Sequence, residues 1–342
     1  MRIPAFLGTL LCAVLIAGGG ARGQDSRVNA DFKLAVNLFN DGLYDLAAEQ
    51  LDRFISSYPG TDQSVEARYY LGLSRLRTGR HEEARLALQA FALSYPDNHR
   101  APEAWWHVAE SHLVQGSLRE AALAFERVKL FHPRSSRAPE ALLQAGGCFL
   151  RAGDSQSALR VFRIVLQEYP TAAQALGART GMGEIYFREG NLEQARNELR
   201  RVADADPSPA SRDQALLLLG QIAQAEGHFE EARKDFGTVS GRDAASPAAR
   251  TALLSLGRLR ALEGDYAGAI EEYRRVLTHP AQKDSAVQRA ALLEAAAAYT
   301  ALGDHAGAAR NYGAFLQAFP RDSLLSDVQW RAAAAHAAAG DA

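Results

Sequence analysis

Small and apolar residues recur along the chain at constant distances from a glycine, within segments that are otherwise rich in Leu, Ala, Arg and Glu. This glycine returns every 37 residues, with one step of 39, at Gly42, Gly79, Gly116, Gly153, Gly190, Gly227, Gly264, Gly303 and Gly340. In all eight full repeats, alanine stands five residues after it, and glycine or alanine stands seven residues before it. A constant period of this length indicates an array of similar units.

Each period predicts a pair of helices. In six repeats a proline stands 17 residues after the glycine, and about 20 residues separate that proline from the next glycine. Either segment has room for a helix of roughly 12–14 residues, and its commonest residues favour helix. The glycine would end the first helix in a left-handed conformation, and the proline would end the second helix. The small residues would let the two helices approach closely.

The sequence therefore predicts an all-α solenoid of antiparallel helical hairpins with a 37-residue period. Eight full hairpins begin at about residue 28 and a final single helix follows, so that the array covers residues 28–342. This Ala-rich last helix either caps the array or belongs to a longer protein. A chain of 342 residues exceeds the roughly 250–300 residues of a single core, which agrees with a repeat array.

The first 23 residues have the features of a signal peptide, and we assign residues 1–23 to it. Arg2 supplies the positive start, residues 3–17 form an uncharged and mostly apolar run, and residues 21–23 place small side chains before a cleavage point at Gln24. The run is shorter than the about 20 residues that span a bilayer. We therefore expect an exported protein, periplasmic or associated with the outer membrane, whose mature chain has no membrane span. The alternative is an inner-membrane anchor made by an uncleaved signal.

Cysteine usage and charge narrow the function further. Cys12 lies inside the apolar run, and we interpret it as an ordinary residue of that run; a lipidated cysteine is the less favoured alternative. The mature chain then keeps one thiol, that of Cys148. The 38 basic and 40 acidic residues give a formal net charge of −2. This balance gives no support for nucleic-acid binding, which needs a clustered basic surface.

One repeat shows a family resemblance with particular clarity. The segment Gly-Asp-Ser-Gln-Ser-Ala at 153–158, preceded by Gly146 and followed by Phe162 and Tyr169-Pro170, resembles the tetratricopeptide repeat. The linker after Tyr-Pro is longer than in that family, and with its Pro-Glu-Ala restart it is similar to repeats of bacterial cell-envelope proteins. Two such groups are the outer-membrane barrel-assembly lipoprotein and the coordinator of the Tol-Pal system. The resemblance implies a helical solenoid whose first helices line a concave groove for a protein or peptide.

No group of residues has the spacing of a catalytic or metal site. His107 and His112 are five residues apart, which does not place them on one helix face as in a zinc site. Cys148 is better explained as a buried structural thiol. The pair Glu271-Glu272 is interpreted as a solvated helix face and not as two catalytic acids. We therefore expect no enzyme activity, no metal and no cofactor.

The resemblance also suggests partner-binding residues. In the family, the positions ten and six residues before the turn glycine face the groove, and the first of these holds Phe32, Tyr69 and Trp106 in three consecutive repeats. An aromatic ladder of this kind would hold an extended or helical peptide. The alternative is that these rings pack only between neighbouring repeats. Trp105, one residue before Trp106, is expected in the core.

These features predict an exported scaffold or adaptor of the cell envelope that binds a partner protein or peptide. The alternative is a regulatory or substrate-presenting module of an envelope enzyme or assembly machine, related to peptidoglycan or to the outer membrane. Repeats that clamp the acidic C-termini of cytosolic chaperones carry basic residues and asparagine at the groove positions. Here the first two repeats hold Phe32, Val36, Tyr69 and Leu73, which argues against that subtype.

Overall fold

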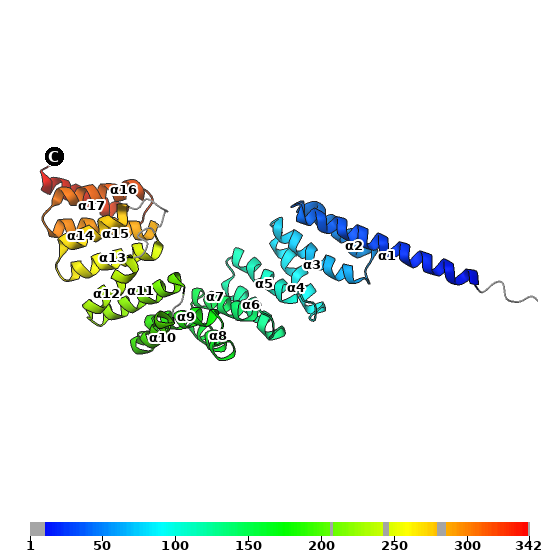
Figure 1. Cartoon of the computed structure of the whole chain (residues 1–342). Coiled ribbons are helices and arrows are strands. Elements are labelled where there is room, and N and C mark those ends of the chain that lie inside the picture. The colour runs from blue at the N-terminus through cyan, green and yellow to red at the C-terminus, as the bar shows by residue number, and fades with distance from the viewer. Residues whose placement is uncertain (1–10, 206–207, 242–245, 279–284, 341–342) are drawn as a thin grey trace, which may run out of the picture. The chain divides into compact units, whose positions relative to one another are not determined.

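The structure is a computed structural model that describes residues 11–205, 208–241, 246–278 and 285–340. Within these residues the chain forms 17 helices and no strand, which confirms the predicted all-α class (Figure 1). The odd-numbered helices are the first helices of the repeats and the even-numbered helices are the second. They are α1 (Leu11–Asn40), α2 (Tyr44–Ser57), α3 (Asp62–Arg77), α4 (His81–Ser94), α5 (Ala101–Val114), α6 (Leu118–Phe131), α7 (Ala138–Arg151), α8 (Ser155–Glu168), α9 (Gln174–Arg188), α10 (Leu192–Asp204), α11 (Pro209–Ala225), α12 (Phe229–Ser240), α13 (Pro247–Leu262), α14 (Tyr266–Thr278), α15 (Ser285–Ala301), α16 (His305–Ala318) and α17 (Leu325–Ala339).

The chain divides into two compact units, Met1–Gln174 and Ala175–Ala342, a division that the uniform period did not predict. The first unit contains the four hairpins from α1–α2 to α7–α8. The second contains the four hairpins from α9–α10 to α15–α16, followed by α17. Within each unit a helix packs mainly against the helices next to it in the chain, as in other repeat arrays.

The predicted turn glycines are confirmed. All nine end a first helix, with φ between 74° and 82°, in the left-handed region that only glycine adopts without strain. The second helices are 12–14 residues long, as predicted. Among the first helices from α3 onward, α5 and α7 have 14 residues, as predicted, and the others are longer than predicted, at 15–17 residues. In α3, for example, the N-cap residue Thr61 accepts a hydrogen bond from the Ser64 amide, and the helix begins at Asp62, three residues after Pro59.

The small residue seven positions before the turn glycine lies under a large side chain of the second helix. A Cβ built on Gly72 would stand 2.6 Å from Cγ of Leu88, and one on Gly220 would stand 2.6 Å from Cε1 of Phe236. The alanines five positions after the turn glycine are all fully buried. The close crossing of the two helices, predicted from these small residues, is therefore confirmed.

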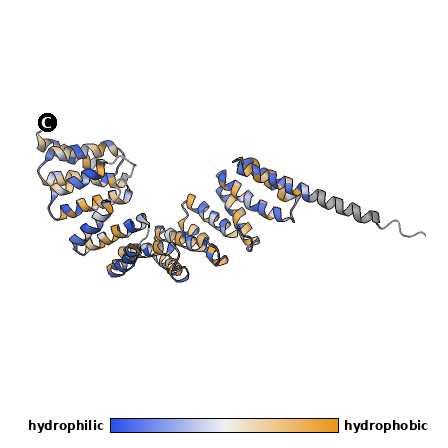
Figure 2. Cartoon of the chain, viewed as in Figure 1, coloured by the Kyte–Doolittle hydropathy of each residue, from blue (hydrophilic) through white to orange (hydrophobic). Residues whose placement is uncertain are grey.

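Each hairpin buries apolar side chains between its helices and those of its neighbours. Figure 2 shows hydrophobic and hydrophilic residues mixed along α2 to α17. In α1, Val28 and Ala35 belong to the first buried cluster. Of the helices in the described part of the chain, none combines the length and the apolar character needed to cross a membrane.

Candidate partner-binding surface

The three predicted ladder residues lie on α1, α3 and α5, and each ring packs against an aromatic ring of its own second helix. The ring centroids of Phe32 and Tyr69 each lie 5.5 Å from that of a phenylalanine on the second helix. Trp106 meets Phe125 edge to face at 4.9 Å. Tyr69 is only 3% exposed, whereas Phe32 and Trp106 are half-buried. The role of these three residues as partner anchors stays a prediction. The contacts show which ring each of them would pack against if their role were packing alone.

An arginine from the following hairpin lies against Tyr69. The guanidinium carbon of Arg100 stands 5.1 Å from the ring centroids of both Tyr69 and Tyr70. An ion pair with Glu66 and a 3.2 Å hydrogen bond donated to the Tyr70 hydroxyl hold the guanidinium there. Burial, and after it the nearby carboxylate of Glu103, raise the pKa of Tyr69 to about 12. The phenol of Tyr69 is therefore part of a packed cluster.

The next repeat has the same arrangement around Trp106. The guanidinium carbon of Arg137 lies 5.0 Å from the Trp106 ring centroid, and Arg137 pairs with Glu103 at 2.7 Å. Stacking of this kind contributes about 0.5–1 kcal/mol at exposed sites. The sequence expectations did not include these arginines, although a signal was present. It is the segment Arg-Ala-Pro-Glu, which occurs at 100–103 and again, 37 residues later, at 137–140.

The indole of Trp106 also belongs to a polar cluster on α5. Its Nε1–H donates to Oε1 of Glu110 at 2.8 Å, and Nδ1 of His107 lies 2.8 Å from the other carboxylate oxygen. Burial alone would raise the pKa of Glu110, but the hydrogen bonds with His107 and Trp106 outweigh it, and the pKa is lowered. Glu110 stands six residues before the turn glycine, the second of the two positions expected to face the groove. Its hydrogen-bonded carboxylate therefore lies beside the half-buried indole of Trp106.

Two hollows of similar size, about 430 and 420 Å³, lie in the second unit. Residues of α11, α13, α14 and α15 line the first hollow, and residues of α15, α16 and α17 line the second. Equivalent positions of consecutive repeats line them. Nine residues after the turn glycine stands a tyrosine, Tyr273 or Tyr312, and six residues before the next turn glycine stands an alanine, Ala297 or Ala334. The repeat therefore builds the same hollow twice.

The rims of the two hollows combine exposed apolar side chains with paired charges. Leu262 lines the first hollow, and Trp330, which is 72% exposed, lines the second. At the first hollow Arg258 pairs with Glu294 at 2.6 Å. At the second hollow, Asp327 and Arg331 of α17 form an ion pair at 2.9 Å. Because these charges satisfy each other, the hollows present mainly apolar surface.

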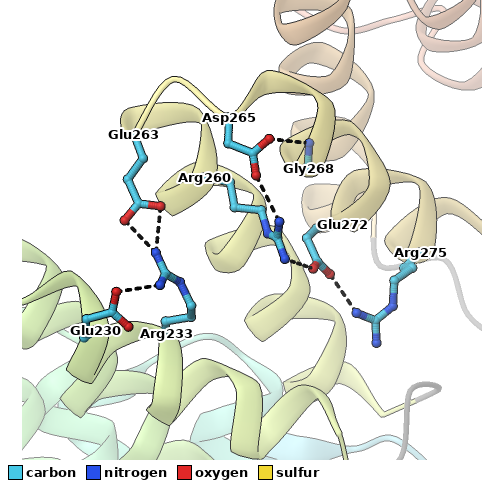
Figure 3. Close-up of polar contacts among 8 residues, drawn as sticks. All are labelled: Glu230, Arg233, Arg260, Glu263, Asp265, Gly268, Glu272 and Arg275. Atoms are coloured by element: carbon cyan, nitrogen blue, oxygen red, sulfur yellow. Dashed lines mark hydrogen bonds and ion pairs between the residues drawn. The ribbon is translucent and has the colours of Figure 1, made fainter.

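One carboxylate that was expected in solvent is buried in the second unit (Figure 3). Glu271 is exposed, as the sequence suggested, but Glu272 is only 7% exposed, and the interpretation of this pair as a solvated face is wrong for it. Arg275 pairs with Glu272 at 2.7 Å, and Arg260 approaches it at 3.5 Å while pairing with Asp265 at 3.0 Å. Two guanidinium groups therefore compensate the buried charge, and the group is a structural ion network.

A neighbouring arginine connects two hairpins in the same region (Figure 3). Arg233 of α12 pairs with Glu230 of its own helix and with Glu263 after α13, both at 2.7 Å. Exposed pairs of this kind contribute little stability individually, typically about 0–1 kcal/mol. These charged groups have partners within the chain, and they are weaker candidates for a binding site than the hollows.

The remaining candidate chemistry has structural roles. Cys148 is buried, as predicted, and burial raises the pKa of its thiol, which lowers the fraction of reactive thiolate. Trp105 is almost fully buried, as expected. Throughout the described ranges, His, Cys, Asp and Glu side chains form no group of three that could hold a metal ion.

Comparison with protein families matches the chain to the tetratricopeptide repeat at residues 32–99, 149–217, 217–286 and 290–322. Together these segments cover more than half of the chain. No curated protein matches it in sequence.

Several solved structures have a similar fold. A tetratricopeptide repeat protein from Parabacteroides merdae is 14% identical, with a TM-score of 0.50 over 78% of this chain and 98% of its own. PilW, a widely conserved type IV pilus biogenesis factor, is 18% identical, with a TM-score of 0.55 over 68% of this chain and 100% of its own. Pseudomonas aeruginosa PilF is 16% identical, with a TM-score of 0.51 over 67% of this chain and 96% of its own. At these identities the similarity shows the fold alone.

Proposed function

The chain belongs to the tetratricopeptide repeat family, and from this premise we propose that it is an exported scaffold of the cell envelope that binds a partner protein or peptide. The proposed binding surface is the first-helix face of its hairpins. In such arrays the first helices of successive repeats form a continuous surface, which suits an extended ligand better than a small molecule. The chain itself would bind and position its partner, and would not catalyse a reaction.

The pair of equivalent hollows in the second unit carries this proposal. A tyrosine ring beside small alanine side chains leaves room for an apolar side chain, as protein pockets generally do. The ion pairs at the rims remove the net charge that would attract a charged group. Two such hollows one repeat apart suit a partner segment with two apolar side chains, in either an extended or a helical conformation.

The ladder position would supply a second contact in the first unit. Phe32 and Trp106 keep part of their rings accessible, and Trp106 is oriented by Glu110 and Arg137. Ordered aromatic rings of this kind are typical anchors in protein interfaces. Tyr69 is too buried to contact a partner over much of its surface, and in this proposal it supports Arg100 and the packing between the repeats.

Export is part of the proposal and rests on the features of residues 1–23. The mature chain would begin at Gln24 and act in the periplasm or at the outer membrane. PilW, which shares the fold, is a pilus biogenesis factor, and an envelope assembly role agrees with a signal peptide. The alternative function, a regulatory or substrate-presenting module of an envelope enzyme or assembly machine, would use the same first-helix face.

Two matched substitutions test the proposed surface. Ala297 and Ala314 are both exposed residues within helices, but Ala297 lines the first hollow whereas Ala314 lies on α16 and lines neither hollow. The mature chain is cross-linked to an envelope extract, and its partners are identified by mass spectrometry. We expect a partner that is recovered with the wild type and with Ala314→Arg but lost with Ala297→Arg. Equal recovery by all three chains would refute this face as the site, and no enrichment over a control without bait would refute the scaffold function.

A further inference from the structure

A smaller hollow, of about 230 Å³, lies in the first unit among α2, α3 and α4. It shares no lining residue with the two hollows of the second unit, and most of its lining residues belong to second helices. Two arginines of α3, Arg68 and Arg75, line it. We name it the arginine hollow.

Both arginines carry a donor that has no acceptor. The Nε atom of each is buried and makes no hydrogen bond. Arg75 has a long ion pair, at 3.6 Å, with the exposed Glu83, whereas Arg68 pairs with no carboxylate among the residues that the structure describes. Asp52 also lines the hollow, but it is exposed and forms no ion pair with either arginine. A buried donor without an acceptor costs free energy, so Arg68 is poised to accept a ligand.

Another repeat of the chain shows which group satisfies an arginine at this position. Arg68 stands eleven residues before its turn glycine, and Arg179 of α9 stands at the same position of its own repeat. Arg179 donates a hydrogen bond to Glu198 of α10 at 2.6 Å. Glu198 stands eight residues after its turn glycine, where the repeat of Arg68 has Ala87.

Ala87 lines the arginine hollow, and its methyl group does not fill the space that a glutamate side chain would take there. The two repeats therefore have the same arginine, but only one of them supplies its carboxylate from within the chain. The other surroundings of the hollow suit the aliphatic stem of an acidic group, because Ile55 and Leu71 line it as well.

We propose that the arginine hollow binds a carboxylate group on a short aliphatic stem, which is the chemistry of a glutamate or aspartate side chain and of a peptide C-terminus. Arg68 would donate to this carboxylate as Arg179 donates to Glu198. Hydrogen bonds between an arginine and a carboxylate are charge-assisted and stronger than those between neutral groups. The hollow lies away from the surface proposed above for the partner, so the inference does not depend on that function.

Two small carboxylates represent the two sources in the test. N-acetylglutamate amide carries its carboxylate on the side chain, and N-acetylalanine carries it at the terminus. Each is titrated into the mature chain and followed through the NMR signals of the arginine Nε–H groups, where the signal of Arg68 is the one that Arg68→Gln removes. We expect a saturable shift of this signal, and the probe with the higher affinity identifies the source.

Three variants locate the binding. In Arg68→Gln the signal of Arg75 reports on the same hollow, and the affinity should fall at least about tenfold. Ala87→Glu should abolish binding, because its own carboxylate fills the hollow as Glu198 does in its repeat. The matched control is Leu86→Glu, which adds the same charge one residue earlier. Leu86 is 56% exposed and does not line the hollow, so this variant should bind as the wild type does.

Thermal melts show first that the variants are folded, and Arg68→Gln carries the test if Ala87→Glu is not. The absence of a saturable shift with both carboxylates would overturn the proposal. So would equal affinity of the wild type and Arg68→Gln, or equal weakening by Ala87→Glu and Leu86→Glu, because binding would then lie outside the hollow. Inorganic phosphate is the third probe, and tighter binding of phosphate than of either carboxylate would overturn the choice of ligand.

Discussion

Adding one methyl group to Gly146 or to Gly147, two adjacent residues in the middle of α7, should change stability in opposite directions. Both substitutions by alanine gain the same helix preference, about 0.8–1 kcal/mol. A Cβ on Gly146 would lie 2.6 Å from Cδ1 and 2.7 Å from Cζ of Phe162, and closer still to Cε1. A Cβ on Gly147 would have no described heavy atom within 4 Å.

The magnitude follows from the surroundings of Phe162. Its ring is buried and rigid, so that α7 and α8 must separate slightly or the ring must leave its preferred rotamer. Overpacking of this kind costs about 1–3 kcal/mol. After the gain in helix preference, Gly146→Ala should range from nearly neutral to about 2 kcal/mol less stable than the wild type. Gly147→Ala should be up to about 1 kcal/mol more stable.

Urea unfolding followed by circular dichroism measures both variants beside the wild type. Because a repeat array can unfold in steps, the variants are compared only where the slopes of their transitions agree. The difference between the two variants isolates the overpacking cost, since the helix preference is common to both. Equal midpoints for Gly146→Ala and Gly147→Ala would show that the small residues of this series do not set the distance between the helices.

Three further predictions concern other parts of the chain. Trp106→Phe keeps a ring against Phe125 but loses the hydrogen bond to Glu110, so it should weaken partner binding with little change in the urea midpoint. A lowered midpoint with unchanged binding would leave Trp106 a packing residue. Burial, with Glu231 nearby, raises the pKa of Asp235 from 3.8 to about 6. The folded state thus holds this proton more tightly than the unfolded state, and stability should fall as pH rises from about 4 to about 6. Asp235→Asn should lose less stability than the wild type between pH 4 and pH 7 in urea melts, and identical losses would contradict the assignment. Mass spectrometry of the native protein should find an N-terminus at or near Gln24, and an intact chain in the cytoplasm would contradict export.

The sequence was sufficient for the parts of the fold that depend on the backbone. A left-handed turn after each first helix requires glycine, so Gly42 and its equivalents marked the turns correctly. The small residues predicted close crossings because a Cβ at a position such as Gly72 would meet Leu88. The helix lengths were less accurate, since the start of a first helix depends on individual caps such as Thr61.

Side chains that meet between helices were harder to anticipate. Arg275 stands three residues after Glu272 on α14, but Arg260 reaches Glu272 from α13, and no spacing within one helix marks that second contact. The arginine that stacks on Trp106 stands 31 residues later in the chain. The sequence shows the segment Arg-Ala-Pro-Glu twice, at 100–103 and at 137–140. The contact of its arginine with an aromatic ring, however, depends on how one hairpin packs against the next.

Aligned positions share a place on the helix but not an environment. Tyr69, Trp106 and Trp330 all stand ten residues before a turn glycine, yet Tyr69 is nearly buried, Trp106 is half-buried and Trp330 is largely exposed. The difference lies in the neighbours. An arginine covers the first two, and among the described residues no second helix covers Trp330. An aromatic residue at this position therefore indicates packing unless its neighbours leave it uncovered.

The same reasoning applies to the two hollows that Ala297 and Ala334 line. The position six residues before the turn glycine holds Val36 and Leu73 in the first two repeats, but Ala297 and Ala334 in the last two. A larger side chain at this position would occupy the space that both hollows provide. In the eight hairpins, the small residues five after and seven before the turn glycine are buried by contacts between helices, and they are unavailable to a partner. Binding surfaces in this chain are therefore to be sought where one repeat departs from the others.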